Sequence, residues 1–339
     1  MRGGPSQKHR IRKALLNGCL LLTFLAACTS SIPTTSPEVA FSPDPPTPSL
    51  SPATASVTAA SPTAEFSPTA TSTQLPPDFW QKLPVIPEKI SDRTREIYRL
   101  GLSLGNDPHI FSRIGDCASA APAFLVGFDG NYNLGEYTTL QPAIDYFKGS
   151  FKRPSLAAKN GLNTAGLLST LWTGEQCLKH ETLLDCQYRL DRPSFAIISI
   201  GTNEAYYVHH NPASFETNMR IIIEDTLEQG IIPILGTKAD NFEGDNSINA
   251  TIAHLALEYE VPLWNFWLAA QPLPNQGMVD ASHLSTVSYQ NFTDFSIPHS
   301  LEYGMQVHNL TALQILYFLW GQLAGTSPLD VVATSNPTP

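Results

Sequence analysis

The stretch that decides the fold is Phe195-Ala-Ile-Ile-Ser-Ile-Gly201, which is apolar at nearly every position and ends in glycine. Such a strand is typical of a parallel sheet covered by helices on both faces, because both sets of its side chains are buried. Residues 214–229 follow as an amphipathic helix that Gly230 closes, and residues 231–236 form the next buried strand. This alternation of strand and helix predicts an α/β fold.

The same alternation extends from this stretch in both directions along the chain. Further strands are expected at residues 110–115, 155–161 and 261–267, and further helices at 89–104, 118–128, 138–147, 164–172, 247–259 and 305–323. About five parallel strands with helices on both faces predict a doubly wound, flavodoxin-like, three-layer α/β/α fold. Ligands bind beyond the carboxyl ends of such strands, so the polar residues after each strand are the candidates for a site.

Residues 1–27 have the composition of an export signal. Arg and Lys gather in the first thirteen positions, and an apolar run too short for an ordinary membrane span follows. The run ends in Leu25-Ala26-Ala27-Cys28, which resembles the lipobox of bacterial lipoproteins, where the cysteine is lipidated and becomes the mature N-terminus. The alternative is an ordinary secretory signal. We expect a protein anchored to the cell membrane through Cys28 and facing the extracytoplasmic side.

Composition divides the rest of the chain into a linker, a domain and a tail. Residues 28–78 are rich in Pro, Ser and Thr and cannot bury enough apolar surface to fold, so they are predicted to be a disordered tether behind the lipidated Cys28. Residues 79–325 are the expected folded domain, and residues 326–339 a disordered tail. The formal net charge of −10 argues against a nucleic-acid partner, which would require a basic surface.

The five cysteines have different expected roles. Cys19 lies in the signal and Cys28 carries the lipid. Cys177 and Cys186 are close in sequence, and a disulfide between them is plausible outside the cytoplasm. Cys117 is then left unpaired. It is either a reactive thiol or a buried and inert cysteine, which is the more common fate of a free cysteine.

Four short polar blocks follow the expected strands. Each block taken singly is also compatible with a simple turn. In chain order the blocks are Gly115-Asp116-Cys117, Asn160-Gly161, Gly201-Thr202-Asn203-Glu204 and Asp280-Ala281-Ser282-His283. Together, over about residues 91–323, they resemble the SGNH hydrolase superfamily, also called GDSL esterases/lipases.

The resemblance implies a carboxylic ester hydrolase that works through a covalent acyl-enzyme. His283 would be the general base that activates Cys117, and Asp280 would orient the imidazole and stabilise its charged form. The backbone N–H groups of Cys117 and Gly161 and the side-chain amide of Asn203 would form the oxyanion hole.

Cys117 departs from the family pattern, which has serine at this position. One interpretation is a working thiol triad, in which a histidine and a helix N-terminus lower the thiol pKa. A second is a catalytically silent binding lipoprotein, and a thiol-dependent acyltransferase is a further alternative. Replacement of the nucleophile by Ser112 or Ser119 is disfavoured, because neither lies at the turn after the strand. The complete base, acid and amide donor favour an active enzyme.

The substrate and ligands follow from less specific observations. Export and a long tether favour a small-molecule or glycan ester, such as an acetylated glycan. No metal or organic cofactor is expected, because none of these mechanisms requires one. The adjacent His209 and His210 are not expected to bind a metal, since they cannot easily face one ion. Five more residues are expected at the rim of the site or, for the aromatic ones, in the core: Glu204, Tyr206, Tyr207, Trp264 and Trp267.

Overall fold

The computed structural model describes residues 76–120, 122–207, 211–288 and 290–323. The expected signal peptide, Cys28, nearly all of the expected tether, and the tail lie outside these residues. Within them, no helix has the length and apolar character needed to cross a membrane. The described part is an α/β fold with one parallel sheet between helices, so the expected fold class is confirmed.

The sheet has four strands in the order β1-β2-β3-β4, where about five were expected. All neighbouring strands are parallel, so their carboxyl ends share one edge of the sheet. β2 and β3 are buried along their whole length, as their apolar sequences predict. The bounds are β1 Asp107–Gly115, β2 Pro193–Ser199, β3 Ile232–Gly236 and β4 Leu263–Trp264.

The expected strand at 155–161 is reduced to one isolated bridge between Gly115 and Ala158. The segment does lie beside the carboxyl end of β1, because the N–H of Gly115 donates to the carbonyl of Ala157 at 2.9 Å. It does not extend into a ladder because side chains take its backbone groups. The N–H of Leu156, for example, donates to Oε1 of Gln187 at 2.6 Å.

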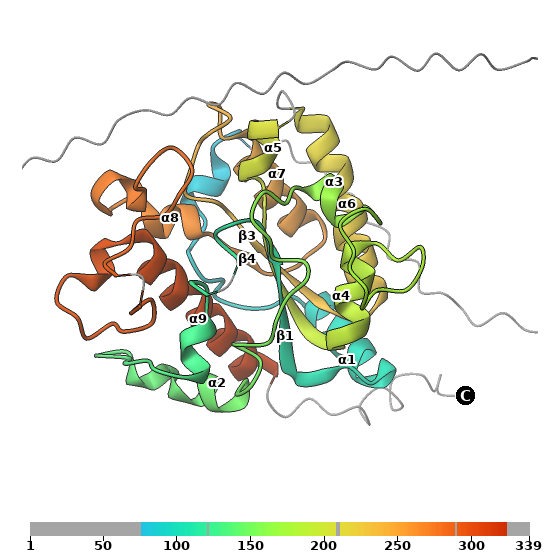
Figure 1. Ribbon diagram of the computed structural model, residues 1–339, viewed down its shortest axis with the longest axis horizontal. Coiled ribbons are helices and arrows are strands. Elements are labelled where there is room, and N and C mark those ends of the chain that lie inside the picture. The colour runs from blue at the N-terminus through green and yellow to red at the C-terminus, as the bar shows by residue number, and fades with distance from the viewer. Residues whose placement is uncertain (1–75, 121, 208–210, 289, 324–339) are drawn as a thin grey trace, which may run out of the picture. The chain divides into compact units, whose positions relative to one another are not determined.

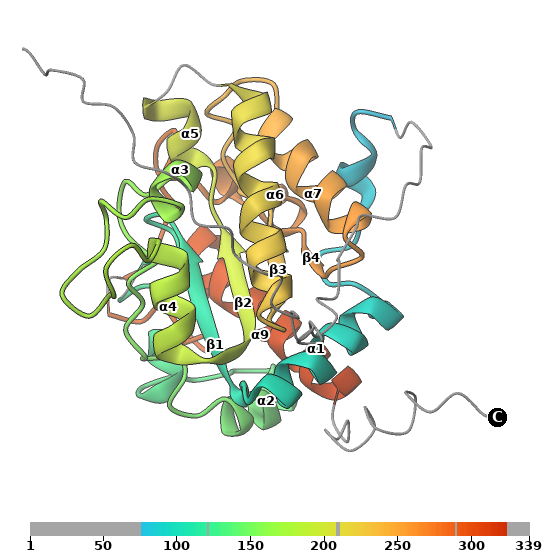
Figure 2. The same ribbon diagram turned by 90° about the vertical axis from the view of Figure 1, so that its right-hand side faces the viewer.

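Helices cover both faces of the sheet (Figures 1 and 2). Helices α4, α6 and α7 lie on one face, and α9 lies on the opposite face with α2 packed against it. Helix α1 contacts β2 and β3. The bounds are α1 Asp92–Leu104, α2 Gln141–Tyr146, α3 Thr164–Leu167, α4 Leu183–Asp191, α5 Thr202–Tyr207, α6 Pro212–Glu228, α7 Ser247–Glu258, α8 Phe266–Ala270 and α9 Gly304–Leu323.

The prediction of a helix at residues 118–128 is wrong. Among its described residues, only a 3-10 turn at Val126–Asp129 is helical. The carbonyl of Asp116 accepts the N–H groups of both Ser119 and Ala120, which closes a turn instead. Pro122 follows, and it has no N–H to donate and disfavours helical geometry in the residue before it.

Two other expected elements are shorter than the sequence suggested. The helix expected at 164–172 ends with α3 at Leu167, and the strand expected at 261–267 is only β4. Helix α8 begins directly after β4 because Oγ1 of Thr237 accepts the N–H of Trp267 at 2.9 Å. Helices α4, α5 and α8 were not expected. The other expected elements agree within three residues at each end.

Gly115 packs directly against the carbonyl of Ser199 in β2, and this contact predicts that a side chain at position 115 strongly lowers stability. A Cβ atom at this position would overlap the carbonyl oxygen of Ser199, and the backbone φ of 154° favours glycine. Gly115→Ala should therefore lower the free energy of unfolding by about 3 kcal/mol, measured by urea denaturation. Gly174→Ala is the matched control, because no atom lies within 4 Å of its added Cβ. Equal stability of the two variants would contradict the expectation.

Candidate active site

A tight turn at the end of β1 presents Cys117 at the carboxyl edge of the sheet. Asp116 is buried, and its Oδ1 accepts the N–H of Ala118 at 3.2 Å. Cys117 is partly exposed and is the free cysteine of the described residues. The first block therefore forms the tight turn expected of a nucleophile turn, and the carboxylate of Asp116 supports its backbone.

The electrostatic environment raises the pKa of the Cys117 thiol to about 11. Burial is the largest cause, and the neighbouring carboxylate of Asp116 adds to it. The expectation that a helix N-terminus lowers this pKa is wrong, since no helix begins at Cys117. The thiol is thus neutral near pH 7, and any attack by sulfur requires a base.

The fourth block forms a histidine–carboxylate pair. Nδ1 of His283 lies 2.9 Å and 3.0 Å from the two carboxylate oxygens of Asp280. A carboxylate only accepts hydrogen bonds, so Nδ1 carries the proton and Nε2 keeps a free lone pair. The N–H groups of Ser282 and His283 donate to Oδ1 of Asp280, and the first of these is the largest cause that lowers the pKa of Asp280 to about 2.

The loop that carries this pair is fixed to the start of α9. The N–H of Val279 donates to the carbonyl of His283 at 2.9 Å, which closes the loop on itself. The N–H of Ser285 donates to Gly277, and the N–H of Met305 in α9 donates to Ser285. The side chains of Asp280 and His283 remain more than half exposed, at 55% and 58%. The imidazole is therefore held by its backbone and by Asp280 while open to a ligand.

One small cavity joins the first and the fourth blocks. Its volume is about 20 Å³, and its lining includes Asp116 and Ala118, which flank Cys117, and Ser282 and Leu284, which flank His283. The structure thus brings the nucleophile turn and the histidine loop together. Among the described residues no hydrogen bond joins Cys117 to His283; such bonds are often long until a substrate is bound.

The second and third blocks meet through Asn203. Its side-chain amide donates to the carbonyl of Leu162 at 3.0 Å, which uses one of its two hydrogens. Gly161 has a φ of 78°, a conformation that favours glycine. In the described part of the chain, the N–H groups of Cys117 and Gly161 donate to no other residue. These three groups are the ones expected to donate to an oxyanion.

Glu204 supports the backbone from a buried position and does not lie at the rim of the site, where it was expected. It is buried, and its Oε1 accepts the N–H of Thr164, the first residue of α3, at 2.5 Å. The third block thereby holds the short helix that follows the second block. This contact fixes the spacing between Gly161 and Asn203.

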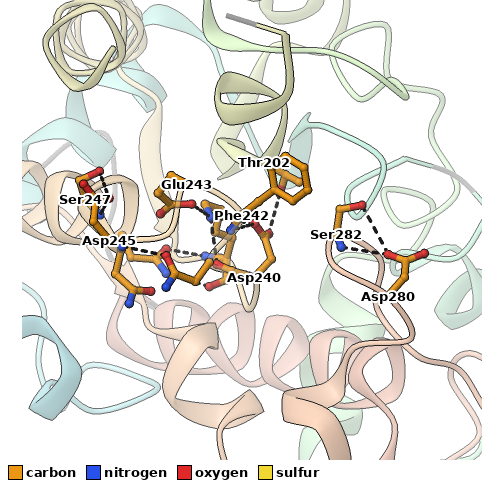
Figure 3. Close-up of polar contacts among 12 residues, drawn as sticks. Thr202, Asp240, Phe242, Glu243, Asp245, Ser247, Asp280 and Ser282 are labelled. Carbon is orange, nitrogen blue, oxygen red and sulfur yellow. Dashed lines mark hydrogen bonds and ion pairs between the residues drawn. The ribbon is translucent and has the colours of Figure 1, made fainter. Parts of the chain in front are cut away.

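A buried ionic cluster lies beside the third block (Figure 3). Nζ of Lys238 donates to Oδ1 of Asp240 at 2.8 Å and to Oε2 of Glu243 at 2.5 Å, and all three side chains are buried. Oγ1 of Thr202 donates to Oδ2 of Asp240 at 2.8 Å. The cluster thus links the loop after β3 to the block that contains Asn203. Sequence reasoning missed Lys238 and Asp240, whose only signal was their position just after β3.

His308 of α9 is a second residue that sequence reasoning missed. It lines the same small cavity, and its ring contacts Phe124, Trp264 and Phe266. Burial lowers the pKa of His308 to about 3, so the ring is neutral. Within the described residues its Nδ1 has no hydrogen-bond partner.

The two serines considered as alternative nucleophiles are both buried, and both hydroxyl groups donate hydrogen bonds within the protein. Oγ of Ser112 donates to Oδ2 of Asp191 at 2.6 Å, and Oγ of Ser119 donates to the carbonyl of Ser199 at 3.1 Å. Neither hydroxyl is accessible to a substrate. The structure therefore leaves Cys117 as the candidate nucleophile at this turn.

Two of the aromatic candidates, Trp264 and Trp267, pack in or against the core. Trp264 is fully buried, and its Nε1 donates to Thr311 at 3.0 Å. Trp267 packs edge-on against Trp80. Both belong to the core and not to a binding surface. The side chains of Tyr206 and Tyr207, and residues His209 and His210, lie outside the described part.

The expected disulfide between Cys177 and Cys186 is present. Together with Glu181 these cysteines form the only group of three potential metal ligands found close together among the described residues. Because the two sulfurs are bonded to each other, neither is available as a thiolate ligand.

The chain is similar to solved structures at low sequence identity. One is a lipolytic protein of the G-D-S-L family from Desulfitobacterium hafniense, with 15% identity, a TM-score of 0.39, and coverage of 60% of this chain and 98% of that one. Another is a catalytic mutant of an acetylxylan esterase from Geobacillus stearothermophilus, with 14% identity, a TM-score of 0.39, and coverage of 62% and 94%. No family model and no curated protein matches the chain.

The buried Asp116 predicts a specific dependence of stability on pH. Burial is the main cause that raises its pKa from 3.8 to about 6. The folded state therefore holds this proton more tightly than the unfolded state, and the stabilisation is lost as the pH rises through about 6. Relative to Asp116→Asn, the wild type should lose about 2 kcal/mol of unfolding free energy between about pH 4 and pH 7.

Urea denaturation of both proteins across this pH range measures the difference. Asp225, whose pKa is also raised to about 6, is present in both proteins, so its contribution cancels. Parallel pH profiles for the two proteins would show that Asp116 is already ionised at low pH in the folded state.

Proposed function

We propose that the protein is an exported, lipid-anchored ester hydrolase of the SGNH type, which cleaves an acyl or acetyl ester through Cys117, His283 and Asp280. The observation that carries the proposal is the Asp280–His283 pair, whose loop shares a cavity with the turn that presents Cys117. A base oriented by a carboxylate beside a nucleophile is the arrangement that acyl transfer requires.

In the first half of the proposed reaction, Sγ of Cys117 attacks the ester carbonyl carbon while Nε2 of His283 takes the thiol proton. The developing oxyanion accepts hydrogen bonds from the N–H groups of Cys117 and Gly161 and from the amide of Asn203. The C–O bond to the alcohol then breaks, and His283 gives its proton to the departing oxygen. An acyl thioester remains on Cys117.

In the second half, water attacks the thioester carbonyl and gives a proton to His283. The C–S bond breaks, the carboxylic acid leaves, and the proton returns to Sγ. Asp280 stabilises the imidazolium in both halves, because its low pKa of about 2 keeps it ionised at neutral pH. The raised pKa of Cys117 means that His283 acts as a general base during attack and not as the partner of a preformed thiolate.

The membrane location and the substrate class rest on the sequence. The lipobox around Cys28 and the tether to residue 78 support anchoring on the extracytoplasmic side. A domain on such a tether can reach envelope or extracellular material, which supports a small-molecule or glycan ester as substrate.

A catalytically silent binding protein is the second candidate. The raised pKa of Cys117 favours it, as does the lack of a hydrogen bond between Cys117 and His283 among the described residues. A sulfur that a base cannot reach would leave the cleft able to bind an ester without cleaving it.

Hydrolysis of p-nitrophenyl acetate by the purified full-length protein separates the two candidates. Cys117→Ala and His283→Ala should each lower kcat/KM by about a thousandfold, because each removes a member of the triad. The matched control is His299→Ala, which removes an exposed histidine that pairs with Glu302 in the same i, i+3 arrangement. It should leave activity unchanged. An inactive wild type that gains activity in Cys117→Ser would instead identify a lapsed hydrolase.

The raised thiol pKa predicts how Cys117 reacts with iodoacetamide. The rate of alkylation should rise about tenfold for each pH unit between about pH 6 and 9, because the thiolate fraction rises in proportion. Mass spectrometry of the peptide that contains Cys117 measures this rate separately from the other cysteines. A plateau that begins below about pH 7 would reveal a thiolate–imidazolium pair and contradict the general-base mechanism.

A further inference from the structure

A separate groove begins at the proposed oxyanion donor Gly161. Its volume is about 570 Å³, and it is larger than the cavity between the first and fourth blocks. We call it the Trp172 groove, after its one aromatic lining residue. The lining residues used below are Asn160, Gly161, Asn163, Gly166, Ser169 and Trp172.

Trp172 is positioned by contacts on both its backbone and its ring. Its carbonyl accepts a hydrogen bond from Nζ of Lys159 at 3.0 Å. Its indole lies beside Gly166, where an added Cβ would stand 3.6 Å from the ring. The side chain is nevertheless 40% exposed, so part of its aromatic surface is available to a ligand.

The segment that carries Trp172 is braced at both ends. The N–H of Leu183 donates to the carbonyl of Ser169, and the disulfide of Cys177 and Cys186 ties the far side of the loop to α4. Arg189 of α4 contributes further contacts, since it pairs with Glu181 and donates to the carbonyl of Gln176 at 2.9 Å. A rigid loop holds an aromatic side chain ready without an ordering cost on binding.

The residues that line the Trp172 groove are uncharged and include both polar and aromatic side chains. None of its seven residues is charged, which disfavours an anionic or cationic ligand. The side chains of Asn160, Asn163 and Ser169 supply amide and hydroxyl groups, and within the described residues the Asn160 amide is bonded to no protein group. One aromatic face with several neutral hydrogen-bonding groups suits a ring that has apolar C–H faces and hydroxyl edges.

We propose that the Trp172 groove binds a saccharide ring of the substrate, stacked on Trp172, while the acyl group lies at Cys117. The proposal rests on the proposed function and narrows its substrate to an acylated glycan. The groove starts at Gly161, so a sugar that carries the ester would lie beside the oxyanion donors. An acyl chain is the poorer occupant, because the amides along the groove would lose hydrogen bonds to water without replacing them.

Calorimetric binding of neutral oligosaccharides to full-length Cys117→Ala tests the groove without requiring turnover. The probes are xylotetraose, cellotetraose and chitotetraose. At least one should bind, and adding Trp172→Ala should weaken its affinity by about tenfold or more, because the stacking surface is lost. The matched control is Leu171→Ala, which removes the neighbouring and more exposed side chain (89%) and should leave the affinity unchanged.

The proposal is overturned if no probe binds, or if Trp172→Ala and Leu171→Ala have equal effects. It is also overturned if octanoate, as an acyl-chain probe, binds in place of the oligosaccharides in a Trp172-dependent manner. Failure of the proposed function has a different signature. In that case oligosaccharide binding depends on Trp172, while the wild type does not hydrolyse p-nitrophenyl acetate or acetylated forms of the bound oligosaccharide.

Discussion

The close approach of β1 to β2 at Gly115 is the constraint on which the candidate site depends. No side chain fits between Gly115 and the carbonyl of Ser199, so the first strand must end there in glycine. The next two residues lie at the edge of the sheet, where Asp116 is buried and Cys117 is partly exposed. Parallel pairing then brings the ends of β2, β3 and β4 to the same edge, where the remaining polar groups lie.

The charged side chains at the carboxyl edge of the sheet stabilise the backbone there and do not lower the pKa of the Cys117 thiol. Lys238 forms ion pairs with both Asp240 and Glu243, and Thr202 links this cluster to the block that contains Asn203. The nearby carboxylates and burial raise the pKa of the thiol, whereas a serine hydroxyl at the same turn would be neutral in any environment. The raised thiol pKa agrees with the proposed mechanism, in which the nucleophile gives up its proton only during attack.

The loop between α3 and α4 shows how a peripheral feature can extend such a site. A disulfide is expected to add little stability when it closes so short a loop, yet here it braces the segment that presents Trp172. The groove between that loop and Gly161 is neutral, while the edge of the sheet is charged. The two regions differ in chemistry and meet at one proposed oxyanion donor, which is the arrangement expected when one ligand spans both.

The sequence by itself determined the α/β class, three of the strands, most helices and the four polar blocks, because apolar periodicity and glycine-terminated strands are local signals. It also determined the unpaired state of Cys117 by counting cysteines. The turn that replaces the expected helix after Cys117 has local causes, namely the Asp116 carbonyl and Pro122. Only the tertiary structure decided that the segment at 155–161 is a single bridge, since the distant side chain of Gln187 takes one of its backbone N–H groups. The raised pKa of the Cys117 thiol likewise depends mainly on burial, which no local pattern reveals.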